Sequence, residues 1–177
     1  HESQSRFYEN IIGRSKEFWT YFYPEVQKRF PQFKGFSLDE FYKGINAVEP
    51  SLVRTEADEL TYSLHIVIRY EVEKEIFNGN VDVDDLPALW NRKYKEYLGV
   101  EPQNDAEGVL QDIHWAGGDF GYFPSYALGN LYGAQFLHKM KKDIPDIMDR
   151  VSRGDLNSVH EWLKNNVHKY GSVYKPV

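Results

Sequence analysis

Two His-Glu pairs, His1-Glu2 and His160-Glu161, are the first candidates for metal chemistry in this sequence. The helical zinc motif H-E-x-x-H needs a second histidine four residues after the first, one helical turn further on. A serine and a lysine stand at these positions instead, so neither pair is a complete site of this type. Taken alone, each pair is either a part of a metal site or an ordinary surface pair.

Gln111, Asp112 and His114 bring an amide, a carboxylate and an imidazole together within four residues. They stand directly before a segment, 115–121, that has three glycines in seven positions. Such a polar run can contribute to a binding or catalytic site beside a flexible loop. It can equally be a capped helix end whose histidine is satisfied by neighbouring groups. The residues alone leave both interpretations open.

Tyr122 and Tyr126 follow the glycine-rich segment. A tyrosine hydroxyl beside a flexible segment can move and donate a hydrogen bond to a developing oxyanion. Ordinary aromatic packing at a helix start is the alternative. Arg54 carries a forked guanidinium that suits a carboxylate, either the terminal group of a substrate or an aspartate of the protein itself.

Helical periodicity dominates the chain and supplies the elements that must position these residues. The clearest helix spans 55–77, where Thr55 and Asp58 have the form of a capping box. Charged residues crowd its later turns and predict that this end is solvated; they are Glu71, Glu73, Lys74 and Glu75. The other expected helices span 3–23 with a short continuation past Pro24 to Phe30, 37–48 after a Ser37–Glu40 capping box, 85–99, 124–141, a short segment from Pro145, and 158–169. A brief strand near 121–123 is a further prediction.

Composition excludes several classes of protein. The 177 residues suit one domain with a sizeable core, and 27 acidic against 21 basic residues give a net charge of −6. A mildly acidic chain lacks the basic footprint of a nucleic-acid binder, and no apolar run approaches the length of a membrane span. The chain has no cysteine, which excludes disulfides and a cysteine nucleophile and fits a cytoplasmic location. We therefore expect one mainly α-helical unit over 1–177, with neither nucleic acid nor a membrane as a partner.

Three segments resemble, in order, the motifs of the M32 metallocarboxypeptidases, the carboxypeptidase Taq family. Residues 1–4 are similar to its HES(G/Q) motif, and residues 53–58 are similar to IRxxAD with valine in place of isoleucine. Residues 108–115 match GxxQDxHW at every fixed position. The resemblance implies a helical fold of the neurolysin and angiotensin-converting-enzyme type. The HPF, DxRxT and HExxH motifs that precede HES(G/Q) in the family are not in this sequence, so the chain looks like a C-terminal part that begins at HES(G/Q).

The resemblance implies a role for each candidate. Glu2 would be the third ligand of a Zn²⁺ or Co²⁺ ion, while two histidine ligands and a general-base glutamate would come from the HExxH helix. Tyr122 would stabilise the oxyanion, and His114 would hydrogen-bond the substrate or intermediate. The residues that would bind the terminal carboxylate of a peptide and shape its subsite are Arg54, Gln111, Asp112 and Tyr126.

Two further expectations follow from the resemblance. The whole enzyme would be a homodimer that removes C-terminal residues from peptides, and the 177-residue chain alone would be inactive. The rival hypothesis is a non-catalytic helical module that binds peptides or a partner. An esterase-like hydrolase finds no support, because the sequence has no G-x-S-x-G elbow.

Overall fold

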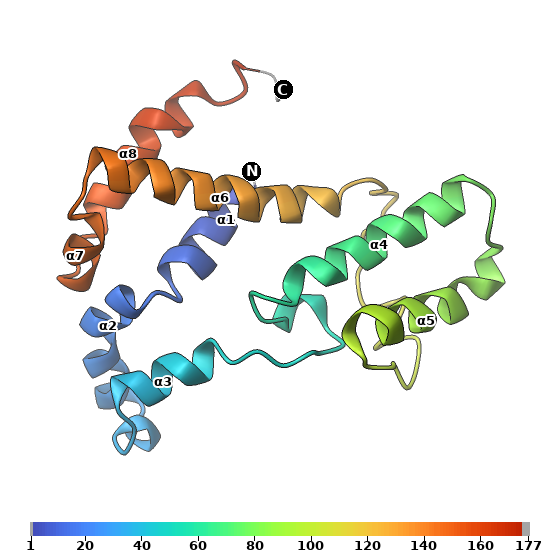
Figure 1. Ribbon diagram of the computed structural model, residues 1–177, viewed down its shortest axis with the longest axis horizontal. Coiled ribbons are helices and arrows are strands. Elements are labelled where there is room, and N and C mark those ends of the chain that lie inside the picture. The colour runs from blue at the N-terminus through green and yellow to red at the C-terminus, as the bar shows by residue number, and fades with distance from the viewer. Residues whose placement is uncertain (1, 175–177) are drawn as a thin grey trace. The chain divides into compact units, whose positions relative to one another are not determined.

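A computed structural model describes residues 2–174, and helices joined by turns and loops form this part of the chain (Figure 1). The mainly α-helical fold class is therefore confirmed. The α-helices are α1 (Glu2–Arg6), α2 (Lys16–Arg29), α3 (Leu38–Ile45), α4 (Tyr62–Phe77), α5 (Leu86–Leu98), α6 (Pro124–Asp143), α7 (Ile147–Ser152) and α8 (Asn157–Asn166). Short 3₁₀ turns lie at Pro31–Phe33, Arg54–Glu56, Val83–Asp85 and His168–Tyr170.

The strand predicted near 121–123 is wrong, since the described residues contain no strand. This segment turns directly into α6: the backbone N–H of Ser125 bonds to the carbonyl of Tyr122 at 2.9 Å. Gly121 has a φ of +75°, which lies in the left-handed region and ends any extended run. The carbonyl of Tyr122 is thus bonded within the turn and does not pair with a neighbouring strand.

The first predicted helix is divided differently in the structure. A π-helix, Phe7–Ile12, follows α1, and a turn separates it from α2. Ser15 caps α2 by accepting a hydrogen bond from the backbone N–H of Phe18. Pro24, which was predicted to interrupt the helix, lies inside α2. The break therefore comes at the serine cap and not at the proline.

Two predicted capping boxes had different outcomes. Ser37 and Glu40 exchange the expected hydrogen bonds ahead of α3, with the Ser37 N–H donating to the Glu40 carboxylate at 2.8 Å. Thr55 does not cap a helix, because it lies in the 3₁₀ turn Arg54–Glu56. Asp58 caps the next turn instead, and its carboxylate accepts the N–H groups of Leu60 and Thr61. For this reason α4 begins at Tyr62 and not at residue 55.

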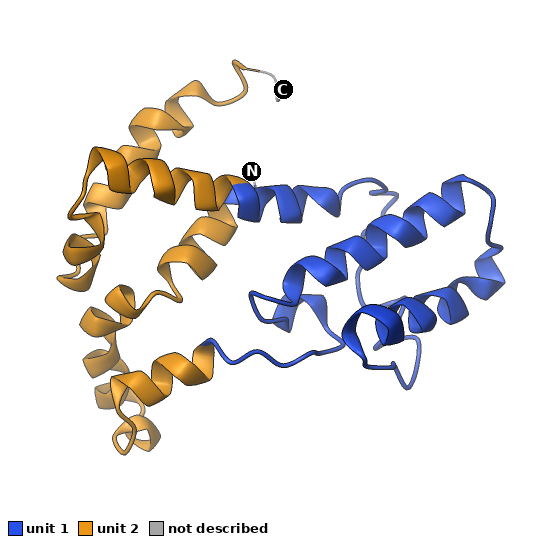
Figure 2. Cartoon of the chain, viewed as in Figure 1, with its two compact units in different colours: residues 1–3, 46–131 blue, residues 4–45, 132–177 orange. Residues whose placement is uncertain are grey.

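The helices belong to two compact units, coloured in Figure 2. Unit 1 comprises residues 1–3 and 46–131, and unit 2 comprises residues 4–45 and 132–177. A single unit over 1–177 stays a prediction. No helix among residues 2–174 combines the length and the apolar character that crossing a bilayer requires.

Unit 2 packs an early and a late part of the chain around one apolar core. The core residues are Phe7, Ile12, Met140, Ile147, Val151, Val159, Trp162 and Leu163. Helices α2 and α7 are in contact. After α7 the chain turns at Gly154, where φ is +85° and an added Cβ would lie 2.5 Å from the ring of Tyr21. A glycine is therefore needed at this position for both reasons.

Unit 1 is built on α4 and α5, which pack against each other (Figure 1). Their shared core consists of Ile68, Val72, Leu89, Trp90, Tyr94 and Leu98. A second cluster, Ala57, Tyr62, Ile66 and Phe123, joins α4 to the start of α6. The indole of Trp115 packs against both clusters, so the loop that precedes α6 is tied to the core.

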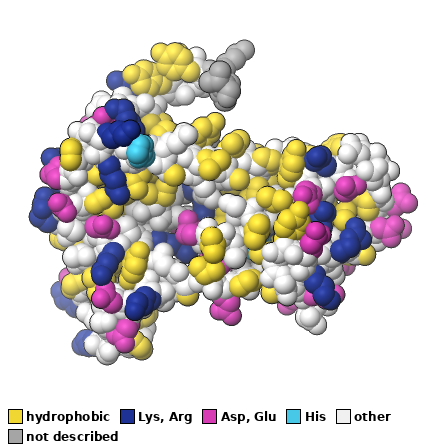
Figure 3. Space-filling model, viewed as in Figure 1, with side chains coloured by type: hydrophobic (Ala, Val, Ile, Leu, Met, Phe, Trp, Pro, Cys, Tyr) yellow, Lys and Arg dark blue, Asp and Glu magenta, His cyan; other side chains and the backbone are white. Residues whose placement is uncertain are grey.

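On the face shown in Figure 3, acidic and basic side chains are interspersed and apolar ones lie between them. That face carries no extended area of one charge sign. This distribution agrees with the modest net charge of −6. The absence of a nucleic-acid partner stays a prediction.

Leu89→Ala is expected to lower the free energy of unfolding by about 2–5 kcal/mol, because the truncation leaves a cavity in the α4–α5 core. Leu89 is 5% exposed, whereas Leu60 of the same unit is 71% exposed. Leu60→Ala is therefore the matched control and should change stability by less than about 0.5 kcal/mol. Urea unfolding of both variants measures the difference, and equal losses would contradict the packing described for α5.

Candidate active site

All seven residues predicted to form a site lie in unit 1. Glu2 begins α1, and Arg54 begins the 3₁₀ turn before α4. Gln111, Asp112 and His114 lie in the loop between α5 and α6, and the two tyrosines lie at and just before the start of α6. Although they span 124 positions of the sequence, the contacts described below join all seven into one connected network.

Asp112 is shared between two buried arginines. Its Oδ1 lies 2.6 Å from Nη2 of Arg54, and its Oδ2 lies 2.7 Å from Nε of Arg69. Burial alone would raise the pKa of the Asp112 carboxyl, but the hydrogen bonds and charges of the two arginines outweigh it and hold that pKa below its ordinary value. Arg54 is thus paired with an aspartate of the protein, one of the two uses that the sequence left open for it.

Gln111 joins the same cluster through all four of its hydrogen-bonding positions. Its Oε1 accepts bonds from the backbone N–H of Arg54 at 3.0 Å and from Nη2 of Arg69 at 2.9 Å. Its Nε2 donates to the carbonyls of Leu52 and Glu107, both at 2.9 Å. The amide is thereby saturated, and it locks the loop onto the segment that carries Arg54.

His114 lies among aromatic rings. Its Nε2 is 3.1 Å from the hydroxyl of Tyr126, and its ring centroid is 4.4 Å from that of Phe123 and 5.7 Å from that of Tyr122. Its Nδ1 is buried, has no hydrogen-bond partner among residues 2–174, and lies 3.9 Å from Asp112. The ring of Tyr126 lies 4.7 Å from the guanidinium carbon of Arg54, which connects the aromatic group to the arginine cluster.

Tyr122 and Glu2 meet although 120 residues separate them. The Tyr122 hydroxyl donates to Oε1 of Glu2 at 2.7 Å. This hydrogen bond, with burial and the Glu2 charge, raises the pKa of Tyr122 to about 12. Gly129 of α6 permits the approach, because an added Cβ there would lie 3.0 Å from the backbone of Glu2 and Ser3.

The carboxylate of Glu2 is the kind of oxygen ligand that zinc accepts. Residues 2–174 contain no group of three or more histidine, aspartate or glutamate side chains that could hold a metal ion. The role of Glu2 as a metal ligand stays a prediction. His1 lies outside the described residues.

Comparisons with known proteins decide the family. The model of the carboxypeptidase Taq (M32) metallopeptidases matches residues 1–177. The chain belongs to this family. Carboxypeptidase 1 of Bacillus subtilis is 58% identical over 178 residues, an alignment that covers 100% of this chain and 36% of the relative. Thermostable carboxypeptidase 1 of Thermus thermophilus is 47% identical over 99% of this chain and 34% of its own length.

A solved structure agrees with these sequence relatives. The structure of Pyrococcus furiosus carboxypeptidase superposes with a TM-score of 0.94 at 43% identity, covering 98% of this chain and 35% of that protein. This M32 chain thus spans about a third of the length of the curated relatives it matches. Its helical fold matches that of a solved M32 enzyme.

Sequence reasoning missed three polar residues of α4 that support the site. His65, Arg69 and Glu73 are all buried, and they lie one helical turn apart. The charges near the end of this helix were expected to be solvated, which is wrong for Glu73. The signal was present in the spacing, because these residues share the 3.6-residue period of the buried face.

His65 is held neutral in the core. Tyr94 accepts a bond from Arg69 Nη1 at 3.1 Å, so its own hydroxyl is assigned as the donor to Nδ1 of His65 at 3.0 Å. Burial, followed by the charges of Arg69 and Arg54, lowers the pKa of His65 to about 4. The proton of its neutral form is then on Nε2, which is buried without a partner among residues 2–174.

The free energy of unfolding should fall as the pH drops from about 6.5 to about 4, because the unfolded chain then protonates His65 and the folded chain does not. This one group contributes a slope of up to about 1.4 kcal/mol per pH unit. In His65→Gln the slope should be shallower by up to that amount. His160→Gln, at an exposed histidine, is the control, and urea unfolding across this pH range is the measurement. Equal slopes in the two variants would contradict the assignment.

Asp112→Asn should lower the free energy of unfolding by about 3–5 kcal/mol, since it leaves two buried guanidinium groups without their carboxylate. Asp105→Asn, at an exposed position of the same loop, is the matched control. Chemical denaturation at neutral pH measures both variants. A loss of less than about 1 kcal/mol for Asp112→Asn would mean that this ion pair does not hold unit 1 together.

Proposed function

We propose that this chain is the C-terminal part of a metal-dependent carboxypeptidase that removes residues from the free carboxyl end of peptides. The supporting observation is the 2.7 Å hydrogen bond between Tyr122 and Glu2. It joins the proposed oxyanion donor to the proposed metal ligand, which are far apart in the sequence. Membership of the M32 family gives that pair its chemical meaning.

The metal would be Zn²⁺ or Co²⁺, with Glu2 as one ligand and the H-E-x-x-H helix of a preceding segment supplying the others. When bound, such an ion polarises the scissile carbonyl and lowers the pKa of a bound water. Within this chain, the Tyr122 hydroxyl donates to Glu2 and so helps to orient its carboxylate.

Tyr122 then serves as the donor to the negative charge that develops on the carbonyl oxygen. Its hydroxyl carries a proton at neutral pH, as an ordinary tyrosine does, and can therefore donate. It is 37% exposed and follows a glycine-rich loop, so its hydroxyl has room to turn from Glu2 toward a substrate. His114 would hydrogen-bond the substrate or intermediate through Nε2, which lies 3.1 Å from the Tyr126 hydroxyl, since its Nδ1 is buried. Both groups act on charge that grows in the transition state.

Arg54 would hold the terminal carboxylate of the peptide. Its bonds to Asp112 and to the Tyr62 hydroxyl use three of its five N–H groups within the described residues. Two arginines facing one aspartate leave the cluster with a net positive charge, which favours an anionic group nearby. Asp112 and the ring of Tyr126 fix the guanidinium, and Gln111 holds the backbone N–H of Arg54. These three residues would shape this subsite.

The 177-residue chain without the H-E-x-x-H segment is expected to be inactive, since neither the general base nor the histidine ligands lie in it. We expect the whole enzyme to be a homodimer. Stoichiometric zinc together with peptide hydrolysis by the 177-residue chain would contradict the first expectation. Sedimentation of the whole enzyme would test the second.

Tyr122→Phe, made in a protein that carries this chain behind an H-E-x-x-H segment and assayed at saturating metal, should lower kcat about 10²–10³-fold and leave KM nearly unchanged. Saturating metal is needed because losing the bond to Glu2 weakens metal affinity. Tyr132→Phe, at a half-exposed tyrosine further along α6, is the control and should retain activity. The substrate is a short N-blocked peptide with a free carboxyl end, assayed beside its C-terminal amide.

Each result has a distinct meaning. Hydrolysis of the amide at the rate of the free acid would refute recognition of the terminal carboxylate. Unchanged kcat in Tyr122→Phe would refute the oxyanion role. No hydrolysis by the unmodified protein with its metal bound would favour the non-catalytic module instead.

A further inference from the structure

Glu73 is a buried carboxylate on α4 that has no part in the proposed reaction. It is 4% exposed. Its Oε1 accepts a hydrogen bond from the indole N–H of Trp115 at 2.7 Å, and its Oε2 accepts one from the backbone N–H of Gly121 at 3.1 Å. A buried carboxylate is costly unless it is well hydrogen-bonded, so these two donors explain why Glu73 stays in the core.

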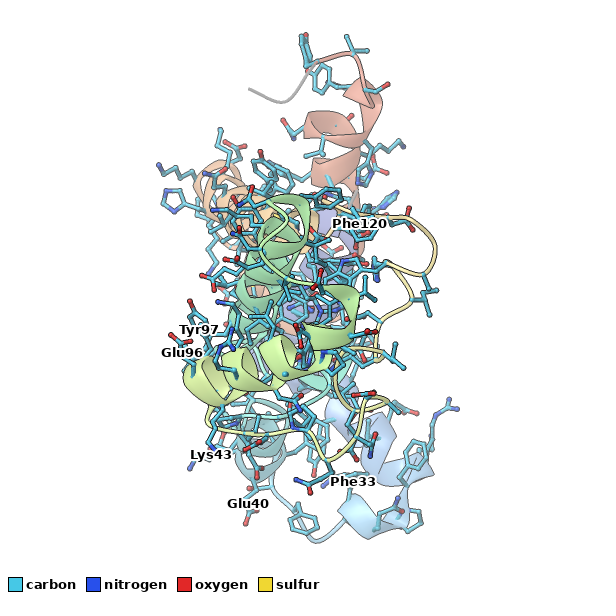
Figure 4. All side chains as sticks on the ribbon, turned by 90° about the vertical axis from the view of Figure 1, so that its right-hand side faces the viewer. Phe33, Glu40, Lys43, Glu96, Tyr97 and Phe120 are labelled. Carbon is cyan, nitrogen blue, oxygen red and sulfur yellow. The ribbon has the colours of Figure 1, made fainter. Side chains whose placement is uncertain are left out.

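The two donors stand at the two ends of the glycine-rich loop, 115–121. Glu73 therefore closes this loop as a bridge between its first and last residues. Backbone hydrogen bonds also shape the loop: the Asp119 N–H bonds to the His114 carbonyl at 2.8 Å, and the Gly118 N–H bonds to the Trp115 carbonyl at 3.1 Å. Gly118 and Gly121 adopt φ values of +81° and +75° in its turns. Phe120, labelled in Figure 4, adds apolar contacts by stacking on Trp115 and packing edge-on against Phe77 of α4.

The closed loop is flanked by the two proposed catalytic groups. His114 directly precedes Trp115, and Tyr122 directly follows Gly121. A displacement at either end of the loop thus moves one of these side chains. A shift of about 1 Å in a catalytic group is enough to reduce a rate substantially.

We propose that Glu73 is a positioning residue, which fixes Tyr122 for the reaction by closing the 115–121 loop. The reaction itself rests on the function proposed above. Glu73 does not touch the substrate, and it acts through its bonds to Trp115 and Gly121. Each donor bonds to a different oxygen of the carboxylate, so in this geometry a side chain that keeps only one of the two acceptor oxygens loses one of the bonds.

Glu73→Gln is the test variant, since the amide keeps the shape of the side chain but loses one acceptor. Its NH₂ group must face either the indole or the Gly121 N–H, so one of the two bonds is lost. Glu71→Gln is the matched control on the same helix, because Glu71 bonds to Lys93 and Tyr97 and not to the loop. Both variants are made in the protein that carries the H-E-x-x-H segment.

The first readout is hydrogen exchange, followed by mass spectrometry on peptides that cover 115–122. Exchange at this loop should become about tenfold faster or more in Glu73→Gln, which corresponds to the loss of one hydrogen bond to a charged acceptor. It should not change in Glu71→Gln. Unchanged exchange in Glu73→Gln would overturn the proposal without bearing on the proposed function.

The second readout is a double-mutant cycle in kcat. Glu73→Gln alone should lower kcat about tenfold or more, with KM changed less than about threefold. In the Tyr122→Phe background the same change should have little further effect, because the group being positioned is already gone. Equal losses in both backgrounds would show that Glu73 acts by some route other than Tyr122 and would overturn the proposal.

Two outcomes need a separate measurement. Glu73→Gln could lower the unfolding temperature more than Glu71→Gln does. In that case Trp115→Phe is the second variant, because it removes the bond between Trp115 and Glu73 from the side of the indole, and it should reproduce the kinetic result. If Tyr122→Phe alone has normal kcat, the proposed role of Tyr122 fails and the positioning proposal fails with it. Faster exchange in Glu73→Gln would then still show that Glu73 closes the loop.

Discussion

Unit 1 depends on one carboxylate that neutralises two buried guanidinium groups. Asp112 comes from the loop between α5 and α6, Arg69 from α4, and Arg54 from the turn that precedes α4. A buried guanidinium is tolerated only where an acceptor meets it, so these three segments can be assembled in very few ways. Once Asp112 is in place, Gln111 and His114 on either side of it are brought to defined positions as well.

Helix α4 acts as the support for this arrangement because part of its buried face is polar. Arg69 binds Asp112, and one turn later Glu73 bonds to the first and the last residue of the glycine-rich loop. His65, one turn earlier, meets Tyr94 of α5. Three successive turns therefore fix three different segments, and the apolar residues between them supply the packing. The helix combines core formation and loop placement in a single element.

The sequence predicted the helical class, the Ser37–Glu40 capping box and the residues whose contacts form one network. These features depend on local periodicity or on short motifs. It did not predict the burial of Arg69 and Glu73. Their spacing matches the buried face of α4, but the partners that compensate their charges lie 43 and 42 residues away and are brought close only by folding. The start of α4 was misplaced for a local reason: two residues could cap, and Asp58 offered more acceptor positions than Thr55.

Gly129 sets how closely two helices pass each other at the proposed metal ligand. With hydrogen as its side chain, the backbone of α6 lies directly against the first residues of α1. Main-chain atoms of the two helices are then in contact, with no flexible side chain between them, so the helices cannot come closer together. Because main-chain atoms cannot be compressed, this contact gives the backbone of Glu2 a fixed reference point on α6. A methyl group at residue 129 would move this reference point by a few tenths of an ångström, a change comparable with the tolerance of a metal–ligand bond length.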